Sequence, residues 1–359
     1  MSNHTYIIAE AGVNHNGSLE MAKHLVDVAK QANADAVKFQ TFKAENLVTR
    51  TAKQAAYQVD NLGEETSQFE MLKKLELSYE AFIELKNYCD SKHIEFLSTP
   101  FDFESVDFLL NDIGMSKVKV PSGELVNSPF IHYIATKGKP MILSTGMATI
   151  DDIHEALSFI AYGLAFHDKP VELNQVNAFY QTEEAKLLLN KYVTLLHCTS
   201  EYPAPLETIN LSAMNEMKKE FQLPIGFSDH SEGIAVPIAA VAIGAVVIEK
   251  HFTLDRNLSG PDHLASLEPK ALEEMAAGIR AVEQSLGTGE KIPTQVELEN
   301  RKVARKSIVA KVPIVVGEKI TADHLAIKRP GNGMPPISYW SLVGKIAGKS
   351  YELDELIDE

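Results

Sequence analysis

Short apolar runs recur along the chain, and each ends at a polar residue or at one of a type that often serves in catalysis. Stretches with apolar residues at every third or fourth position, the spacing of an amphipathic helix, separate most of these runs. The runs are TYIIAEAG (to Gly12), AVKFQTF (to Phe42), IEFLSTPF (to Phe101), VKVPSGE (to Glu124), PMILSTGM (to Met147), VTLLHC (to Cys198), PIGFSDH (to His230) and AVVIEKHF (to Phe252). Eight strand-then-helix units in succession predict an α/β protein with a (β/α)₈ TIM barrel.

In such a barrel the C-terminal ends of all eight strands meet at one mouth, which carries the chemistry. Polar side chains that end the predicted strands should therefore converge there. The residues expected at the mouth are Glu10, Lys38, Gln40, Thr99, Lys119, Ser122, Glu124, Ser144, His230 and His251. The pattern thus predicts both a fold and the position of an active site.

Two of the connections are longer than an ordinary loop between a strand and a helix. Residues 43–65 are polar, and we interpret them as a lid carrying Tyr57, Gln58 and Asn61; a mobile surface loop without substrate contact is the alternative. Residues 161–191 combine two helical patterns with a polar stretch between them. We expect this insertion on the barrel wall to form an interface or to be a plain elaboration of the fold.

The chain should divide into a large domain and a small one. The barrel is expected over residues 1–286, and residues 287–303, with two glycines, a proline and a charged run, are typical of a linker. Residues 304–359 contain short apolar runs separated by turn residues and predict a small β-rich domain. A domain of this size is near the lower limit for independent stability, so we expect it to dock on another surface.

Composition narrows the possible partners and the compartment. The chain has 359 residues with a net charge of −15, which argues against general binding to nucleic acid or to anionic membranes. No apolar run approaches the roughly 20 residues needed to span a bilayer. Cys89 and Cys198 are the only cysteines and do not make a disulfide framework. We therefore expect reduced thiols and a cytoplasmic protein.

Histidines end two neighbouring strands. Because strand residues alternate between faces, Ser228 shares a face with His230, and Glu249 shares a face with His251. Two inward imidazoles predict a divalent-metal site completed by water or substrate oxygens, which would suit a Lewis acid that polarises a carbonyl. The alternative is a pair of histidines hydrogen-bonded at the rim of the barrel.

Two lysines lie near the ends of the second and fourth strands. A lysine that points into a barrel is costly unless it meets an anion, so Lys38 and Lys119 predict a site for a phosphate or carboxylate. Hydroxyl groups that could complete this site belong to Thr99, Ser122, Ser144, Ser200 and Ser228. The alternative is that the lysines pair with the glutamates of the same mouth.

Glu10 and Glu124 are the carboxylates expected to point into the mouth. Near a metal and two lysines they should be ionised and suited to proton transfer, although they could instead serve only as partners of the lysines. His197 and Cys198 are adjacent on one strand and face opposite ways, so a nucleophilic pair is not expected.

Nine motifs follow one another from the first strand to the tail. They are AEAGVNHNGS, VKFQTFKA, FLSTPFD, VPSGE, ILSTGMA, LLHCTSEYPAP, GFSDHSEGI, IEKHFTLDRNLSGPDH and KRPGNG. Together they resemble the sialic acid synthase family, whose members condense phosphoenolpyruvate with an N-acylated amino-sugar to make nonulosonic acids. The resemblance implies a C-terminal antifreeze-like (SAF) domain that crosses to the partner subunit of a domain-swapped homodimer.

The same resemblance implies roles for individual residues. His230 and His251 would bind the divalent metal, typically manganese, with magnesium or cobalt as alternatives, and Glu10 and Glu124 would be the acidic catalytic residues. Phosphoenolpyruvate would be held by Lys38, Thr99, Lys119, Ser122, Ser144, Ser228 and Ser200, the last at a position where some members have asparagine. The sugar would be bound by Gln40, Tyr202, Asp262, the lid residue Asn61 and, from the partner's tail, Arg329.

Several activities remain open. We favour N-acetylneuraminate synthesis from N-acetylmannosamine, with N,N'-diacetyllegionaminate synthesis from 2,4-diacetamido-2,4,6-trideoxymannose as the alternative; a pseudaminic acid synthase is disfavoured by the lid sequence. A non-catalytic sugar- or ice-binding protein would need neither the two lysines nor the two histidines. A generic metal-dependent aldolase should lack the phosphate pocket and would release no phosphate.

Overall fold

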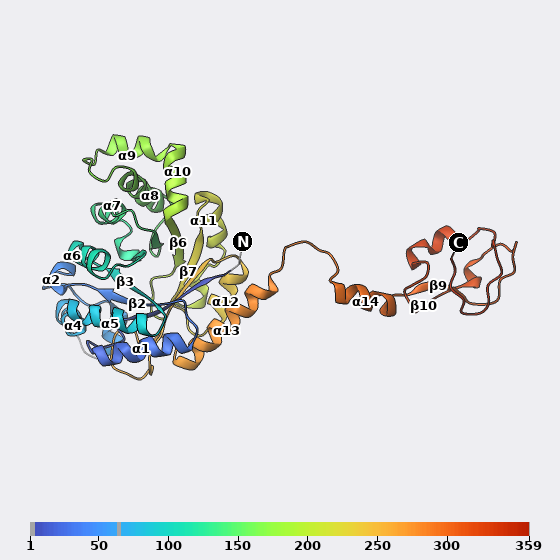
Figure 1. The fold of residues 1–359 in the computed structure, drawn as a ribbon, viewed down its shortest axis with the longest axis horizontal. Helices are drawn as coiled ribbons and strands as arrows, with labels where there is room; N and C mark the ends of the chain where they lie inside the picture. The colour runs from blue at the N-terminus through green and yellow to red at the C-terminus, as the bar shows by residue number, and fades with distance from the viewer. Residues whose placement is uncertain (1–3, 63–65, 359) are drawn as a thin grey trace. The chain divides into compact units, whose positions relative to one another are not determined.

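The computed structural model describes residues 4–62 and 66–358. These residues form two compact units, Met1–Gly287 and Thr288–Glu359. In the first unit eight parallel strands form one sheet in the order β3-β2-β1-β8-β7-β6-β5-β4, and β3 and β4 lie in contact to complete the ring (Figure 1). The strands are β1 Tyr6–Gly12, β2 Ala36–Thr41, β3 Glu95–Pro100, β4 Val118–Val120, β5 Met141–Ser144, β6 Val193–Cys198, β7 Ile225–Asp229 and β8 Val247–His251. The predicted (β/α)₈ barrel is confirmed.

Helices surround these strands (Figure 1). Those of the first unit are α1 Leu19–Gln31, α2 Ala44–Leu47, α3 Ala56–Leu62, α4 Gln68–Leu75, α5 Tyr79–Ser91, α6 Phe103–Asp107, α7 Ser128–Thr136, α8 Ile150–Ala165, α9 Leu173–Tyr180, α10 Glu183–Tyr192, α11 Ala213–Phe221, α12 Ala235–Ala242 and α13 Pro269–Ser285. Their ends follow sequence signals: Ser18 caps α1 by accepting a hydrogen bond from the Met21 N–H. Among the helices of residues 4–62 and 66–358, none combines the length and apolar character needed to cross a lipid bilayer.

The long connections contain secondary structure of their own. Residues 43–62, at the start of the expected lid, form α2 and α3, while residues 63–65 and the side chain of Tyr57 lie outside the described part of the chain. The expected insertion at 161–191 holds the end of α8, then α9 and nearly all of α10. Both segments are therefore more regular than polar loops.

The second unit is built around a two-stranded antiparallel sheet of β9 Ser307–Ala310 and β10 Leu325–Lys328. A small apolar core that includes Ile308, Leu342 and Tyr351 lies beneath it, next to α15 Tyr339–Leu342. The range expected to be a linker, 287–303, contains most of a helix, α14 Gln295–Ala304. Its charged sequence is helical because Thr294 and Glu297 form a capping box at its first turn.

Candidate active site

The inner surface of the barrel is layered, and the layers follow from the two-residue period of a strand. An apolar layer at the bottom consists of Ile8, Ala36, Leu97, Ile142, Leu196 and Val247. Two residues further along the same strands come Glu10, Lys38, Thr99, Ser144, Cys198 and Glu249. Two further again are Gly12, Gln40, Phe101, Gly146, Ser200 and His251. A charged layer therefore rests on an apolar one, and above it lies the mouth of the barrel.

These upper layers line a cavity of about 580 Å³. It contains most of the side chains that the sequence predicted for the mouth. The predicted mouth residues that line it are Glu10, Lys38, Gln40, Thr99, Lys119, Ser122, Ser144, His230 and His251. It is also lined by four further substrate-site candidates, Ser200, Tyr202, Ser228 and Asp262. Strand-end residues that lie far apart in sequence thus come together in one chamber.

Lys38 is held by two carboxylates. Its Nζ donates to Glu10 Oε1 at 2.6 Å and to Thr99 Oγ1 at 3.0 Å, and it lies 3.4 Å from Glu249 Oε2. Burial would lower the pKa of Lys38, but Glu10 and Glu249 outweigh it and raise the pKa above the usual value. Burial would likewise raise the pKa of Glu10, yet Lys38, with His251 and Lys119, holds it well below its usual range. Both groups are therefore charged at neutral pH.

Lys119 has fewer close carboxylate partners than Lys38. Its Nζ donates to Ser144 Oγ at 2.7 Å and lies 3.4 Å from Glu249 Oε1. Burial, followed by the positive charge of Lys38, lowers the pKa of Lys119. A bound anion would reverse this effect, because opposite charge favours the protonated amine. Lys119 is thus a buried amine whose protonated form an anionic ligand would stabilise.

Glu249 is a site residue that the sequence reasoning placed on the correct face but did not select. It is 2% exposed, lies between Lys38 and Lys119, and accepts a hydrogen bond from Ser228 Oγ at 2.8 Å. Its position two residues before His251, on the same face of the strand, was the sequence signal that could have identified it.

Glu124 differs from the expectation: it lies in the 3₁₀ turn Ser122–Glu124, accepts from Asn127 Nδ2 at 2.7 Å, and is absent from the described residues that line the cavity.

The two histidines lie side by side at the mouth. Their ring centroids are 5.7 Å apart, and the Tyr202 ring lies 4.1 Å from that of His230. His230 Nδ1 is 2.6 Å from the Thr199 carbonyl oxygen, which requires an N–H there and leaves Nε2 as the lone-pair nitrogen. Burial, followed by His251, lowers the pKa of His230 to about 3, so its ring is neutral.

This donor set fits a divalent cation with an open coordination shell. His251 Nδ1 is buried and has no hydrogen-bond partner, and His251 Nε2 lies 3.5 Å from Glu10 Oε2. No group of three or more potential protein ligands occurs in the part of the chain that the structure describes. A cation held by His230 and His251 would thus need oxygens from water or substrate, as expected for a catalytic rather than a structural site.

Two glycines are required by close approaches in this chamber. A Cβ at Gly12, whose φ is +53°, would lie 3.2 Å from His251 Cε1. A Cβ at Gly146 would lie 2.2 Å from Ser200 Oγ and 2.9 Å from Cys198 Sγ. A side chain at either position would displace a site residue, which explains the glycines of the AEAG and STGM motifs.

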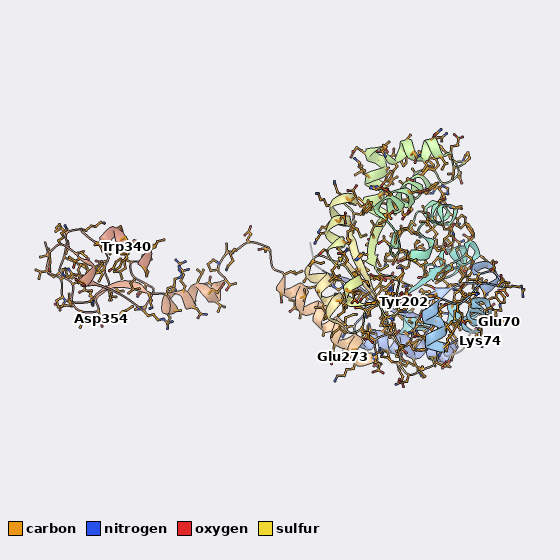
Figure 2. All side chains as sticks on the ribbon, turned by 180° about the vertical axis from the view of Figure 1, so that it is seen from behind. Glu70, Lys74, Tyr202, Glu273, Trp340 and Asp354 are labelled. Atoms are coloured by element: carbon orange, nitrogen blue, oxygen red, sulfur yellow. The ribbon has the colours of Figure 1, made fainter. Side chains whose placement is uncertain are left out.

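The remaining sugar-site candidates are more dispersed. Asp262 is buried, and this burial raises its pKa. The lid residue Asn61 donates from Nδ2 to the Pro261 carbonyl at 2.6 Å, next to Asp262 in sequence. Arg329 belongs to the second unit, where its Nε donates to the Ala304 carbonyl oxygen at 3.0 Å. Its expected role in a partner's site stays a prediction. Tyr202, labelled in Figure 2, lies in the barrel unit.

Comparison with known proteins agrees with this geometry. The sequence pattern of the NeuB family matches residues 25–291. The chain belongs to the NeuB family. The SAF domain matches residues 305–357, so this NeuB-family protein has the C-terminal domain that its motifs implied. As a member of this family the protein is an enzyme, a transferase of the nonulosonic acid synthase type.

Two relatives are named for the same activity. The chain is 46% identical to the N,N'-diacetyllegionaminic acid synthase of Campylobacter jejuni over 355 residues, covering 99% of each chain. It is 45% identical to the enzyme of that name from Legionella pneumophila, covering 94% of this chain and 89% of the relative. The crystal structure of an N-acetylneuraminic acid synthetase from Leptospira borgpetersenii, in complex with citrate, is similar with a TM-score of 0.66 and 33% identity, covering 83% of this chain and 90% of that one.

Proposed function

We propose that this NeuB-family protein is an N,N'-diacetyllegionaminate synthase, which condenses phosphoenolpyruvate with 2,4-diacetamido-2,4,6-trideoxymannose and releases phosphate. The observation that carries this proposal is the 46% identity to a synthase of that name over 99% of both chains. The sequence alone favoured N-acetylmannosamine as the sugar. The alternative has the better support, because the two relatives named for N,N'-diacetyllegionaminic acid synthesis are 46% and 45% identical, whereas a solved structure named for N-acetylneuraminic acid is 33% identical.

The lysine cradle supports phosphoenolpyruvate as one substrate. Lys38 and Lys119 are both buried and converge on Glu249, with the hydroxyls of Ser144 and Thr99 beside their Nζ atoms. A phosphate or carboxylate in this cradle would replace weak ion pairs with charge-assisted hydrogen bonds. The cradle would also hold negative charge as the phosphate ester breaks, which is electrostatic stabilisation by groups already in place.

His230 and His251 would hold a divalent metal, for which we propose manganese. Such an ion would supply Lewis-acid polarisation of the aldehyde of the open-chain sugar. The protein's own contribution is to orient the two rings: the Thr199 carbonyl fixes His230 through Nδ1, and the Tyr202 ring covers its face. Burial keeps His230 neutral, which is the state a ligand needs.

The reaction joins carbon 3 of phosphoenolpyruvate to the aldehyde carbon of the sugar. Water then adds at carbon 2, and phosphate leaves by cleavage of the C–O bond. Glu10 is a poor base because Lys38 and His251 hold its pKa low, and Glu249 is engaged by both lysines. We propose Glu124 as the base for that water, a role that requires its carboxylate to leave Asn127 and turn toward the cavity that Ser122 and Gly123 line.

Phosphate release from phosphoenolpyruvate in the presence of manganese tests the proposal. The purified full-length protein should release phosphate with 2,4-diacetamido-2,4,6-trideoxymannose at a higher kcat/KM than with N-acetylmannosamine. Preference for N-acetylmannosamine would make the enzyme an N-acetylneuraminate synthase with the same site. Absence of phosphate release with both sugars would refute the assignment.

A further inference from the structure

The floor and the outer wall of the active-site cavity differ in chemistry. The floor consists of strand ends and is charged, as described above. The outer wall comes from the segment after β2 and is largely apolar: Leu47, Val48, Met71, Leu72 and Leu75 line it, and Gln58 and Gln68 are its polar members. A sugar-processing chamber thus has an aliphatic side that neither the lysine cradle nor the histidine pair explains.

This wall is a packed structure of its own. Met71 and Leu75 are 5% and 7% exposed and form an apolar cluster with Val13 and Phe42, separate from the main barrel core. Leu47, Leu72 and Phe101 pack against that cluster while remaining half-buried. All three also line the cavity.

The helix α4 presents this wall because it is amphipathic. Ser67 caps it through the Glu70 N–H, and its exposed side carries Glu70 and Lys74, which lie at the outer edge of the barrel unit in Figure 2. Its apolar side carries Met71 and Leu75 at the four-residue spacing of one helix face. The wall is therefore held in place by α4 and does not depend on a ligand.

The orientation of the bound sugar determines which of its carbon atoms contacts this wall. Its aldehyde carbon must lie between the histidine pair and the lysine cradle, at the floor. An open chain anchored there by its aldehyde leaves carbon 6 for the other sides of the cavity, and the outer wall is the apolar one among them. In 2,4-diacetamido-2,4,6-trideoxymannose carbon 6 is a methyl group, whereas in N-acetylmannosamine it carries a hydroxyl.

We propose that the wall formed by Leu47, Met71, Leu72 and Leu75 is the subsite that selects a 6-deoxy sugar, by burying the carbon 6 methyl group. This inference rests on the proposed function and deepens it. A buried hydroxyl without a hydrogen-bond partner is unfavourable, but an apolar pocket rejects an added hydroxyl only to a limited extent, on the order of 100-fold at most. The wall should therefore give a preference of about 10- to 100-fold in kcat/KM.

The test separates carbon 6 from carbon 4 with a third sugar. 2-Acetamido-2,6-dideoxymannose differs from N-acetylmannosamine only at carbon 6 and from the proposed substrate only at carbon 4. Phosphate release by the wild-type protein should show a kcat/KM about 10- to 100-fold higher for the dideoxy sugar than for N-acetylmannosamine. Leu72→Asn, which offers the hydroxyl a partner, should reduce this ratio at least about five-fold.

The control is Leu188→Asn, because Leu188 is also half-buried and packed on apolar side chains but lies on α10, outside the cavity. It should leave the ratio unchanged. If Leu72→Asn does not fold, Leu47→Asn is the second variant. The ratio of kcat/KM values for the two sugars in the wild-type protein tests the subsite without any substitution. The subsite would be overturned by equal kcat/KM values for the dideoxy sugar and N-acetylmannosamine, or by a ratio that neither wall variant changes. In either case, phosphate release with the diacetamido sugar would still support the proposed function. No release with any of the three sugars would overturn both.

Discussion

The substitution Lys250→Met should destabilise the barrel strongly, although it lies outside the cavity. Asp229 and Lys250 are neighbours on β7 and β8, are both 0% exposed, and point away from the side chains that enter the cavity. Lys250 Nζ donates to Asp229 Oδ2 at 2.6 Å and to the Ser231 carbonyl oxygen, while Asp229 Oδ1 accepts from the Ser231 N–H at 2.9 Å. This buried ion pair thus fixes the chain on both sides of His230.

The magnitude follows from what the substitution leaves behind. Methionine has a similar length but no charge, so Asp229 would remain a buried carboxylate with one hydrogen bond. Breaking a buried pair in this way costs about 3–5 kcal/mol. For the unit Met1–Gly287, with an unfolding entropy of about 2.1 cal/mol/K per residue, that loss lowers Tm by roughly 5–8 °C. The double variant Asp229→Asn/Lys250→Met removes both charges and should lose less stability than Lys250→Met alone.

Differential scanning calorimetry of the full-length variants measures these differences. The matched control is Lys117→Met, because Lys117 Nζ lies 2.5 Å from Glu95 Oε1 but the two side chains are 24% and 31% exposed. A half-exposed pair contributes at most about 1 kcal/mol, so this variant should shift Tm by only a few degrees. Equal losses for Lys250→Met and Lys117→Met, or a double variant less stable than Lys250→Met, would refute the reasoning.

Three further predictions concern the site and its surroundings. Lys119→Ala should raise the KM for phosphoenolpyruvate at least about ten-fold by removing a charge-assisted contact, as steady-state phosphate release would show; an unchanged KM would contradict the anion cradle. His251→Ala should abolish manganese binding in a calorimetric titration while the circular dichroism spectrum stays that of the wild type, and undiminished binding would exclude the metal assignment. Burial, followed by His263, lowers the pKa of His15 to about 4, so the unfolded chain binds a proton below pH 6.5 that the folded one does not. His15 should therefore contribute a loss of stability of up to about 3 kcal/mol as pH drops from 6.5 to 4, and His15→Gln should flatten the slope of stability against pH in urea titrations; a slope in His15→Gln equal to that of the wild type would refute it.

Much of the site could be read from the strands because their geometry is local. A side chain two residues from another points to the same side of the strand, whatever the rest of the fold does. This is why Lys38 with Gln40, and Ser228 with His230, were correctly assigned to the cavity. Residues on loops lack such a rule. Glu124 follows a short strand and lies in a 3₁₀ turn, outside the group of cavity-lining residues. The sequence shows no periodic pattern from which the direction of a side chain in this turn could be predicted.

The charged run around Glu297 shows a second kind of limit. Its composition suggested a flexible linker, whereas its capping box and helical propensity make it α14. Composition alone cannot distinguish a solvated helix from a solvated coil, because neither buries an apolar face.

By itself the sequence determined the eight strands, the polar residues that end them and the family to which the chain belongs, because each of these is a property of consecutive residues. Only the tertiary structure decided which of those residues interact. Glu249 lies between Lys38 and Lys119 because ring closure brings β2, β4 and β8 around one axis, and distances across that axis depend on every strand at once. The aliphatic wall of α4 likewise lines the same cavity as the charged floor only because the fold brings the two together.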